Sequence, residues 1–321
     1  MATTDNLTET SYAREYLEIR YQPIIKQFME QIDENLIQLR QIIQIVDIFC
    51  DYAVRHYPDM KLKSGEAAVI GSIFPRLNDL GYSVLKNEKG IFINGNNLKI
   101  FGTANNTLWT AEGVLSGEYD FDNHGEDFIA IDIGMNIGLA SLYLARKEFI
   151  KKVYSFEPFE PIFIQAKNNI NNNPQISSKI EIFNFGLSDE NKTIEVFFNS
   201  NLPGQMSSVN DRFSIDKNLP KQSAILKKAS EIIIPIFAKH KEKIMLKIDC
   251  EGGEREILPD LQSSGLLKQV SVIIMEYHDN YYKPLVELLK ESGFQTKIYN
   301  QNYMEKVGMI YAEKLNCKSS A

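Results

Sequence analysis

Residues 128–146 read FIAIDIGMNIGLASLYLAR, and this stretch decides the fold class. Its first part, FIAIDIG (128–134), is a near-continuous apolar run, which is typical of a parallel strand buried on both faces. A turn of small residues follows, and the apolar spacing of IGLASLYLARKEF (137–149) then predicts a helix. A buried strand that passes through a tight turn into a helix is the opening unit of a doubly wound α/β sheet.

The alternation of strands and helices continues towards the end of the chain. Helices are expected at 161–172 and from about Gly253 and Lys283, because apolar residues there recur at helical spacing. The remaining predicted strands are 152–157, 180–188, 244–249, 271–278, 295–300 and 309–314. This order predicts a mostly parallel sheet with helices on both faces. Residues 189–243 interrupt it: TIEVFFN (193–199) predicts an extra strand, and the polar stretch after it is either a disordered insert or a lid over the site.

Two further segments precede this sheet. Residues 1–60 are predicted to be a helical region, because apolar residues recur three or four positions apart through most of it. Residues 61–122 are predicted to be a small α/β accessory segment, in which Asn94-Gly95 is expected to form a tight hairpin turn. The third segment, residues 123–321, is predicted to be the large α/β domain. The apolar stripe of the first region either packs on the rest of the chain, which we expect, or joins two copies into a homodimer.

Composition narrows the class of protein. The chain has 321 residues, and its 35 Lys+Arg against 42 Asp+Glu disfavour binding of nucleic acid through a basic surface. The three cysteines, Cys50, Cys250 and Cys317, lie far apart, which predicts neither a disulfide framework nor a zinc site and suits a reducing compartment. No apolar run reaches the roughly 20 residues of a membrane-spanning helix, and the first residues lack the apolar core of a signal peptide. We therefore expect a soluble, cytoplasmic protein without a membrane span.

Two acidic residues, Asp132 and Glu157, stand at the ends of consecutive predicted strands, where open α/β sheets bind their ligands. A dinucleotide-binding turn would need glycine at positions 134, 136 and 139, and only Gly134 is present, which disfavours an NAD-dependent oxidoreductase or epimerase. The Glu157 carboxylate can accept hydrogen bonds from both hydroxyls of a ribose, and Asp132 can stabilise a cationic ligand directly or through water. S-adenosylmethionine, which has one ribose, a sulfonium and no phosphate, meets these demands better than NAD does.

Five motifs follow one another in the same part of the chain. They are IDIGMNIGLASLYLA (131–145), YSFEPFEP (154–161), NFGLSD (184–189), LKIDCEGGEREIL (246–258) and IIMEYHD (273–279). In these motifs, residues 128–314 resemble the FkbM family of S-adenosylmethionine-dependent methyltransferases. The resemblance implies a class I, Rossmann-like methyltransferase sheet of seven strands with one antiparallel edge strand. It also implies transfer of a methyl group to a hydroxyl of a saccharide, glycoconjugate or natural-product precursor, with S-adenosylhomocysteine as the product.

The resemblance further implies which residues bind the donor. Asp132 and the turn after it would form the donor loop, Glu157 would bind the ribose, and residues 186–188 would lie beside the adenine. Through the stretch LSGEYDF (115–121), Tyr119 would contact the donor. The full set of implied donor-binding residues is Tyr119, Asp132, Gly134, Asn136, Gly138, Glu157, Pro158, Gly186, Leu187 and Ser188.

The catalytic residues are expected at the strand ends beside the donor loop. A hydroxyl is a poor nucleophile at neutral pH, so a general base within hydrogen-bond reach is expected, and Asp249, Glu276 and His278 are the candidates. Glu276 and His278 lie two apart on one strand, so their side chains share a face. Glu251 is open between a base, a metal ligand and a turn residue. These four groups offer donor atoms for a divalent metal, but their spacing does not require one, and no metal is predicted. Lys247, within an apolar strand, is expected to form a salt bridge with a neighbouring carboxylate.

The sequence thus favours a cytoplasmic O-methyltransferase that uses S-adenosylmethionine and acts on a small-molecule or glycan hydroxyl. Two alternatives stay open: the NAD-dependent oxidoreductase or epimerase, and a non-catalytic scaffold that keeps the methyltransferase fold.

Overall fold

The computed structural model describes residues 46, 49, 50, 53, 55, 64–103, 106–197, 221–300 and 306–314. Apart from the five single residues, which are helical, the predicted helical region 1–60 lies outside the described residues, and so does the homodimer predicted through it. The polar stretch 198–220 of the predicted insert lies outside them as well.

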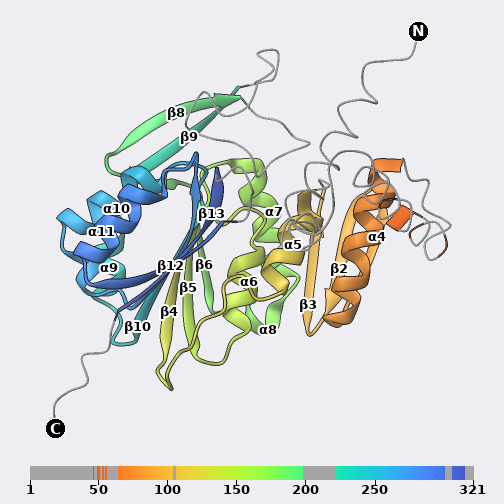
Figure 1. The fold of residues 1–321 in the computed structure, drawn as a ribbon, viewed down its shortest axis with the longest axis horizontal. Coiled ribbons are helices and arrows are strands. Elements are labelled where there is room, and N and C mark those ends of the chain that lie inside the picture. The colour runs from red at the N-terminus through yellow and green to blue at the C-terminus, as the bar shows by residue number, and fades with distance from the viewer. Residues whose placement is uncertain are drawn as a thin grey trace, which may run out of the picture.

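A seven-stranded sheet forms the centre of the molecule (Figure 1), with the strand order β12-β13-β11-β10-β4-β5-β6. Every residue of β4 is buried, and β4 pairs in parallel with β5 and with β10, as its apolar run predicted. The strands are β4 (Phe128–Ile133), β5 (Ile150–Phe156), β6 (Ile180–Phe183), β10 (Lys243–Ile248), β11 (Val272–His278), β12 (Phe294–Asn300) and β13 (Val307–Lys314). The predicted doubly wound, mostly parallel sheet of seven strands is therefore confirmed.

The antiparallel strand of this sheet is β13, and it lies inside the sheet. It pairs in antiparallel fashion with both β11 and β12, while β12 forms the edge. The expectation of an antiparallel strand at the edge is therefore wrong. The reason is the connection: only residues 301–306 separate β12 from β13, and a link of that length can join antiparallel neighbours but not parallel ones.

Helices cover both faces of the sheet (Figure 1). One face packs against α5 (Asn106–Leu115), α6 (Leu139–Arg146) and α7 (Glu160–Asn171), and α8 (Pro174–Ser177) lies beside α6 and α7. The other face packs against α9 (Ala229–Phe237), α10 (Glu254–Ser263) and α11 (Tyr282–Glu291), with the short helix η1 (Leu266–Lys268) next to α10. In β4, Phe128 and Ala130 join the first apolar cluster and Ile129 and Ile131 the second, as the two-residue period of a strand requires. No helix in the described part of the chain is long and apolar enough to cross a membrane.

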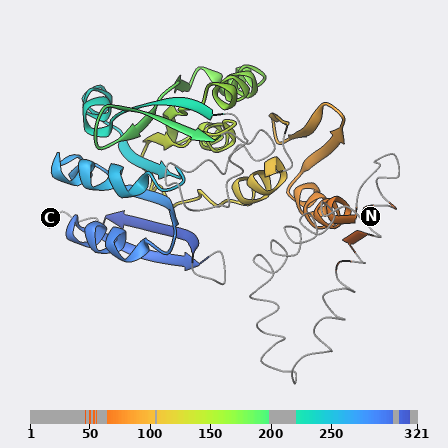
Figure 2. The ribbon, with the colours of Figure 1, turned by 90° about the horizontal axis from the view of Figure 1, so that it is seen from above.

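A separate three-stranded sheet lies at the other end of the molecule from α11 and β12 (Figure 2). It comprises β1 (Tyr82–Asn87), β2 (Gly90–Gly95) and β3 (Leu98–Gly102), and α4 (Ser64–Asp79) packs on β1. The hairpin turn between β2 and β3 is Asn96-Asn97, because Gly95 pairs with Leu98, so the predicted turn at Asn94-Gly95 is wrong. Both turn residues have positive φ, 48° and 62°, which a two-residue hairpin turn requires and asparagine tolerates.

Two buried asparagines of the α7 region dock this small sheet onto the large one. The side-chain oxygen of Asn169 accepts a hydrogen bond from Phe101 N (2.8 Å), and that of Asn173 accepts one from Lys99 N (2.8 Å). Their amide groups donate back to the carbonyls of the same two β3 residues. The pairs act like an additional strand partner for the outer edge of β3.

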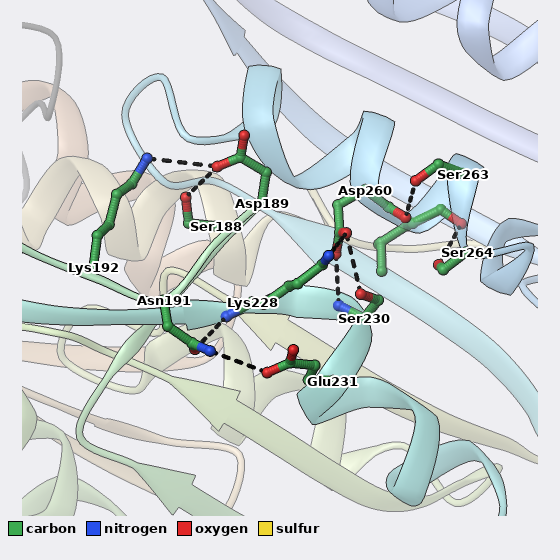
Figure 3. A network of polar contacts seen from close by, with 11 residues as sticks. Ser188, Asp189, Asn191, Lys192, Lys228, Ser230, Glu231, Asp260, Ser263 and Ser264 are labelled. Carbon is green, nitrogen blue, oxygen red and sulfur yellow. Dashed lines mark hydrogen bonds and ion pairs between the residues drawn. The ribbon is translucent and has the colours of Figure 1, made fainter.

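A third small sheet, with the order β7-β9-β8, lies above the carboxyl edge of the central sheet in the view of Figure 1. It comprises β7 (Gly186–Ser188), β8 (Lys192–Phe197) and β9 (Lys221–Lys228), so the single strand predicted over 180–188 is wrong and divides into β6 and β7. The extra strand predicted at 193–199 is present as β8, whereas β9 was not predicted. Figure 3 shows the polar contacts that fix this sheet to α10: Asp260 accepts a hydrogen bond from Ser230 N (2.7 Å) and lies 3.7 Å from the Lys228 ammonium.

Candidate active site

A cavity of about 260 Å³ opens at the carboxyl ends of β4, β5, β10 and β11. Each of these strands supplies a lining residue at or near its end: Gly134, Glu157, Asp249 and Glu276. Because the four strands are neighbours in the sheet, residues that are far apart in the sequence meet here. Open α/β sheets bind their ligands at this edge.

The turn after β4 is shaped by glycine. Gly134 has a φ of +86°, and a Cβ at this position would lie 1.7 Å from the carbonyl oxygen of Asp249. Only glycine therefore lets the loop after β10 approach the turn so closely. Asn136 is also left-handed, with a φ of 51°, and this orientation lets its backbone N–H donate to Glu157 Oε2 at 2.9 Å.

Glu157 is a buried carboxylate fixed by the backbone. Besides the bond from Asn136, its Oε1 accepts a hydrogen bond from Phe159 N at 3.0 Å. Burial raises the pKa of Glu157 to about 7, although the two amide hydrogen bonds and the Lys247 charge act in the opposite direction. Each carboxylate oxygen can accept a further hydrogen bond, and the residue lines the cavity, so Glu157 is built to receive two donors from a ligand.

Asp132 faces the interior of the sheet and is not among the residues that line the cavity. Its carboxylate accepts a hydrogen bond from Ser141 Oγ (2.5 Å) and pairs with the Lys247 ammonium at 3.0 Å. Lys247 is the direct neighbour of Asp132 in the β4–β10 register, and its ammonium also donates to the carbonyl of Gly134 at 2.6 Å. The predicted salt bridge of Lys247 is confirmed. The Asp132 side chain supports the turn through Lys247, and its contact with the donor, direct or through water, stays a prediction.

The other end of the cavity holds a cluster of acidic groups around one histidine. Asp249, Glu276 and His278 each offer a ligand atom, and these atoms lie within 4.8 Å of one another. His278 Nε2 lies 3.3 Å from Glu276 Oε2 and 3.4 Å from Glu251 Oε2. The imidazole is almost fully buried, and its Nδ1 lies 3.4 Å from Oε1 of the buried Glu254.

Crowding of like charges shapes the proton affinity of this cluster. Burial raises the pKa of Glu276 well above its ordinary value, and the nearby charges of Asp249, Glu251 and Glu118 raise it further. The hydrogen bond between Glu276 and Asp249 acts in the same direction on the pKa of Glu276. The neutral form of Glu276 is therefore favoured more than that of an exposed carboxyl group.

Comparison with known proteins identifies the family. The family model of the methyltransferase FkbM domain matches residues 132–296, which is half of the chain. The chain belongs to the FkbM methyltransferase family. S-adenosylmethionine is the methyl donor of this family, and it is thus the cofactor that family membership assigns to the chain, as the sequence predicted.

Relatives of this FkbM methyltransferase include two fungal proteins named as methyltransferases. Methyltransferase sdnD of Sordaria araneosa is 26% identical over 204 residues, which are 55% of this chain and 77% of that protein. Methyltransferase 1 of Beauveria bassiana is 24% identical over 215 residues, which are 61% of this chain and 85% of that protein. A crystal structure of the methyltransferase FkbM from Methylobacillus flagellatus aligns with 13% identity and a TM-score of 0.41, over 76% of this chain and 60% of that chain.

The cavity of this FkbM methyltransferase brings together most of the predicted donor-binding residues. Those that line it are Gly134, Asn136, Glu157, Pro158, Gly186 and Leu187. Four others lie outside the lining. Asp132 and Tyr119 are buried, with the Tyr119 ring 5.6 Å from the Lys247 ammonium. Ser188 donates to Glu256 at 2.5 Å, and Gly138 caps the start of α6 with a φ of +85°.

Of the predicted catalytic residues, Asp249 and Glu276 line the cavity, and His278 stands directly behind them. Glu254 was not singled out by the sequence beyond its place at a helix start. In the structure it is fully buried, accepts a hydrogen bond from Gly252 N (2.9 Å) and faces the His278 ring. Nothing in the sequence distinguishes it from an ordinary acidic residue in the first turn of a helix.

Proposed function

We propose that this FkbM methyltransferase transfers the methyl group of S-adenosylmethionine to a hydroxyl group and forms a methyl ether. The observation that carries the proposal is that the two ends of one cavity hold groups suited to different tasks. One end holds a carboxylate, Glu157, with free acceptor capacity for a ribose. The other holds Asp249 and Glu276, with His278 behind them, as groups that can take a proton. A saccharide or natural-product precursor as acceptor follows the habit of the family.

At the donor end, Glu157 accepts hydrogen bonds from both ribose hydroxyls in this proposal. The turn at Gly134 and Asn136 passes close to the methionine part of the donor, and the mostly apolar surface of Pro158, Gly186 and Leu187 faces the adenine. Asp132 acts indirectly, because it holds Lys247, whose ammonium binds the Gly134 carbonyl. Tyr119, Gly138 and Ser188 support the surrounding backbone.

At the acceptor end, the hydroxyl oxygen attacks the methyl carbon as the bond from that carbon to sulfur breaks. The sulfonium becomes the neutral thioether of S-adenosylhomocysteine, and the hydroxyl proton passes to the acidic cluster at this end, in which Glu251 lines the cavity with Asp249 and Glu276. Holding the oxygen, the carbon and the sulfur in line supplies a large part of the rate, and proton removal contributes about 10²–10⁴-fold.

Calorimetric titration of the full chain with S-adenosylhomocysteine tests the donor end. Glu157→Ala should weaken binding by about tenfold or more, because two hydrogen bonds to a charged acceptor are lost. Glu160→Ala, an exposed acidic residue three positions away, is the matched control and should bind like the wild type. Equal affinity of the two variants would contradict the assignment of Glu157.

Transfer of a radiolabelled methyl group from S-adenosylmethionine into a cell extract tests the reaction. The labelled product should keep its methyl group in mild alkali, as an ether does, and mass spectrometry should place the label on oxygen. Release of the label as methanol would show an ester, and a label on nitrogen or carbon would equally overturn O-methylation of a hydroxyl.

A further inference from the structure

The acidic end of the cavity gathers several carboxylates around one imidazole ring. Around the His278 ring, carboxylate oxygens of Glu276, Glu251 and Glu254 lie at 3.3, 3.4 and 3.4 Å. Lys247 lies 3.7 Å from Asp249 but is already engaged by Asp132 and the Gly134 carbonyl. Buried charges in proteins are paired, protonated or bound to metal ions.

Among the described residues, Arg255 lies beside this cluster. Its guanidinium donates to Asp279 and to the backbone carbonyl of His278, at 2.8 and 2.9 Å. The cluster therefore concentrates carboxylates at one wall of the cavity.

The orientation of His278 gives a second, independent indication of a ligand. Its side chain is 3% exposed, and its Nδ1 has no hydrogen-bond partner among the residues that the structure describes. Nδ1 faces the Glu254 carboxylate at 3.4 Å, while Nε2 is directed towards Glu276 and Glu251. A histidine that binds a metal through one ring nitrogen usually turns the other towards a carboxylate or a carbonyl.

We propose that Asp249, Glu276 and Nε2 of His278 bind one divalent cation at the acceptor end of the cavity. The proposal rests on the proposed methyl transfer and extends it to the acceptor. The three ligand atoms lie within 4.8 Å of one another, a spread that a single ion can bridge after small side-chain adjustments. Two carboxylates and one imidazole suit a cation such as Mn²⁺ or Zn²⁺ better than Ca²⁺, which prefers oxygen alone.

Such an ion defines the class of acceptor. Three protein ligands leave coordination positions open towards the cavity, and an acceptor with two adjacent oxygens, such as a vicinal diol or a 2-hydroxy acid, fills two of them. Coordination lowers the pKa of the bound hydroxyl. Its proton then passes to Glu251, the carboxylate that lines the cavity beside the three ligands, while the oxygen–carbon bond forms and the carbon–sulfur bond breaks.

The site is tested by titration of the full chain with Mn²⁺ after removal of metals by a chelator. Electron paramagnetic resonance and calorimetry measure the binding. We expect one saturable Mn²⁺ per chain. His278→Ala and Glu276→Gln should each weaken it by about tenfold or more, and Glu254→Gln by about tenfold through the orientation of the ring. S-adenosylhomocysteine binding of each variant should stay within about threefold of the wild type, which also shows that the variant is folded.

His124 provides a matched control. It also lies beside two carboxylates, at 3.3 Å from Asp122 and 2.8 Å from Glu313, but it is half exposed and far from the cavity. His124→Ala should therefore bind Mn²⁺ like the wild type. The absence of saturable binding up to about 1 mM Mn²⁺, or equal binding by wild type and His278→Ala, would overturn the proposal.

Activity separates this proposal from the one on which it rests. Methyl transfer that continues at full rate in metal-free enzyme would overturn the cation site and leave O-methylation standing. Saturable Mn²⁺ binding that depends on His278, in a chain that does not bind S-adenosylhomocysteine, would support the site while the proposed methyl transfer fails.

Discussion

The two ends of the cavity are built in different ways. At the donor end, Glu157 is fixed by the backbone amides of Asn136 and Phe159, so the site exists before any ligand arrives. At the acceptor end, the carboxylates of Glu276, Glu251 and Glu254 surround the His278 ring. A site made by the backbone is preorganised, whereas a site made by crowded carboxylates needs a proton or a cation to balance it.

Lys247 connects the two ends. Its ammonium contacts the Asp132 carboxylate (3.0 Å) and the Gly134 carbonyl (2.6 Å) on the donor side, and Asp249 at 3.7 Å on the acceptor side. Because both members of the Lys247–Asp132 pair are almost fully buried, removal of one leaves an uncompensated charge in the core. A substitution of Lys247 is therefore expected to disturb both ends of the cavity.

The largest effect is expected for Lys247→Met. We expect the free energy of unfolding to fall by about 3–5 kcal/mol, measured by chemical denaturation, because the Asp132 carboxylate loses its buried partner. Lys243→Met, on the same strand but exposed, is the control and should change stability by less than about 0.5 kcal/mol. The double variant Asp132→Asn with Lys247→Met should regain part of the loss. A Lys247→Met protein as stable as the Lys243→Met control would contradict this view of the pair.

A second prediction separates two glycines of the donor turn that share a positive φ. At Gly134 a Cβ would lie 1.7 Å from the Asp249 carbonyl oxygen, whereas at Gly138 its nearest neighbour would be Ala166 at 3.4 Å. We expect Gly134→Ala to weaken S-adenosylhomocysteine binding by about 100-fold, equivalent to about 2.7 kcal/mol, because the turn must move away from β10.

Gly138→Ala should instead cost about 1–2 kcal/mol of stability through backbone strain and leave donor affinity within about threefold. Calorimetric titration of both variants measures the difference. If the two bind the donor equally well, close approach of the turn to β10 is not what shapes the donor end.

The sequence predicts those features of the two ends that depend only on the position of a residue along a strand. The strand ends at Asp132, Glu157 and Asp249 were identifiable because buried parallel strands have long apolar runs, and their carboxyl ends meet at one edge. The direction of a side chain was not identifiable in the same way. Both faces of β4 are buried, so alternation does not tell whether Asp132 turns to the cavity or to Lys247.

Elements whose conformation depends on distant partners could not be predicted from local sequence patterns either. Strand β9, KQSAILKK, has few apolar residues, and its pairing with β7 and β8 decides its conformation. The hairpin offered two adjacent turn sequences, Asn94-Gly95 and Asn96-Asn97, and the register of β2 against β3 selects the second. Glu254 became part of the site only because α10 and β11 pack together, which no spacing along the chain indicates.

The smallest expected effect, a dependence of donor binding on pH, sharpens the contrast between the ends. Burial raises the pKa of Glu157 from 4.5 to about 7, so its contribution to the stability of the free protein is present below pH 4.5 and is lost as the pH rises towards 7. Donor binding has the opposite dependence, because the ribose hydroxyls donate to the ionised carboxylate. Between about pH 8 and about pH 6, the ionised fraction falls about tenfold, and the affinity for S-adenosylhomocysteine should fall by about the same factor.

Calorimetry at several pH values with Glu157→Gln as the control completes this test. The amide does not titrate, so its weaker binding should stay constant over the same range, whereas His278→Ala, altered only at the acceptor end, should keep the wild-type slope. A flat profile for the wild type, or an equal slope in Glu157→Gln, would show that another group governs the donor end. A slope that disappears in His278→Ala would show that the two ends titrate together, and the division between a backbone-built and a side-chain-built end would then have to be abandoned.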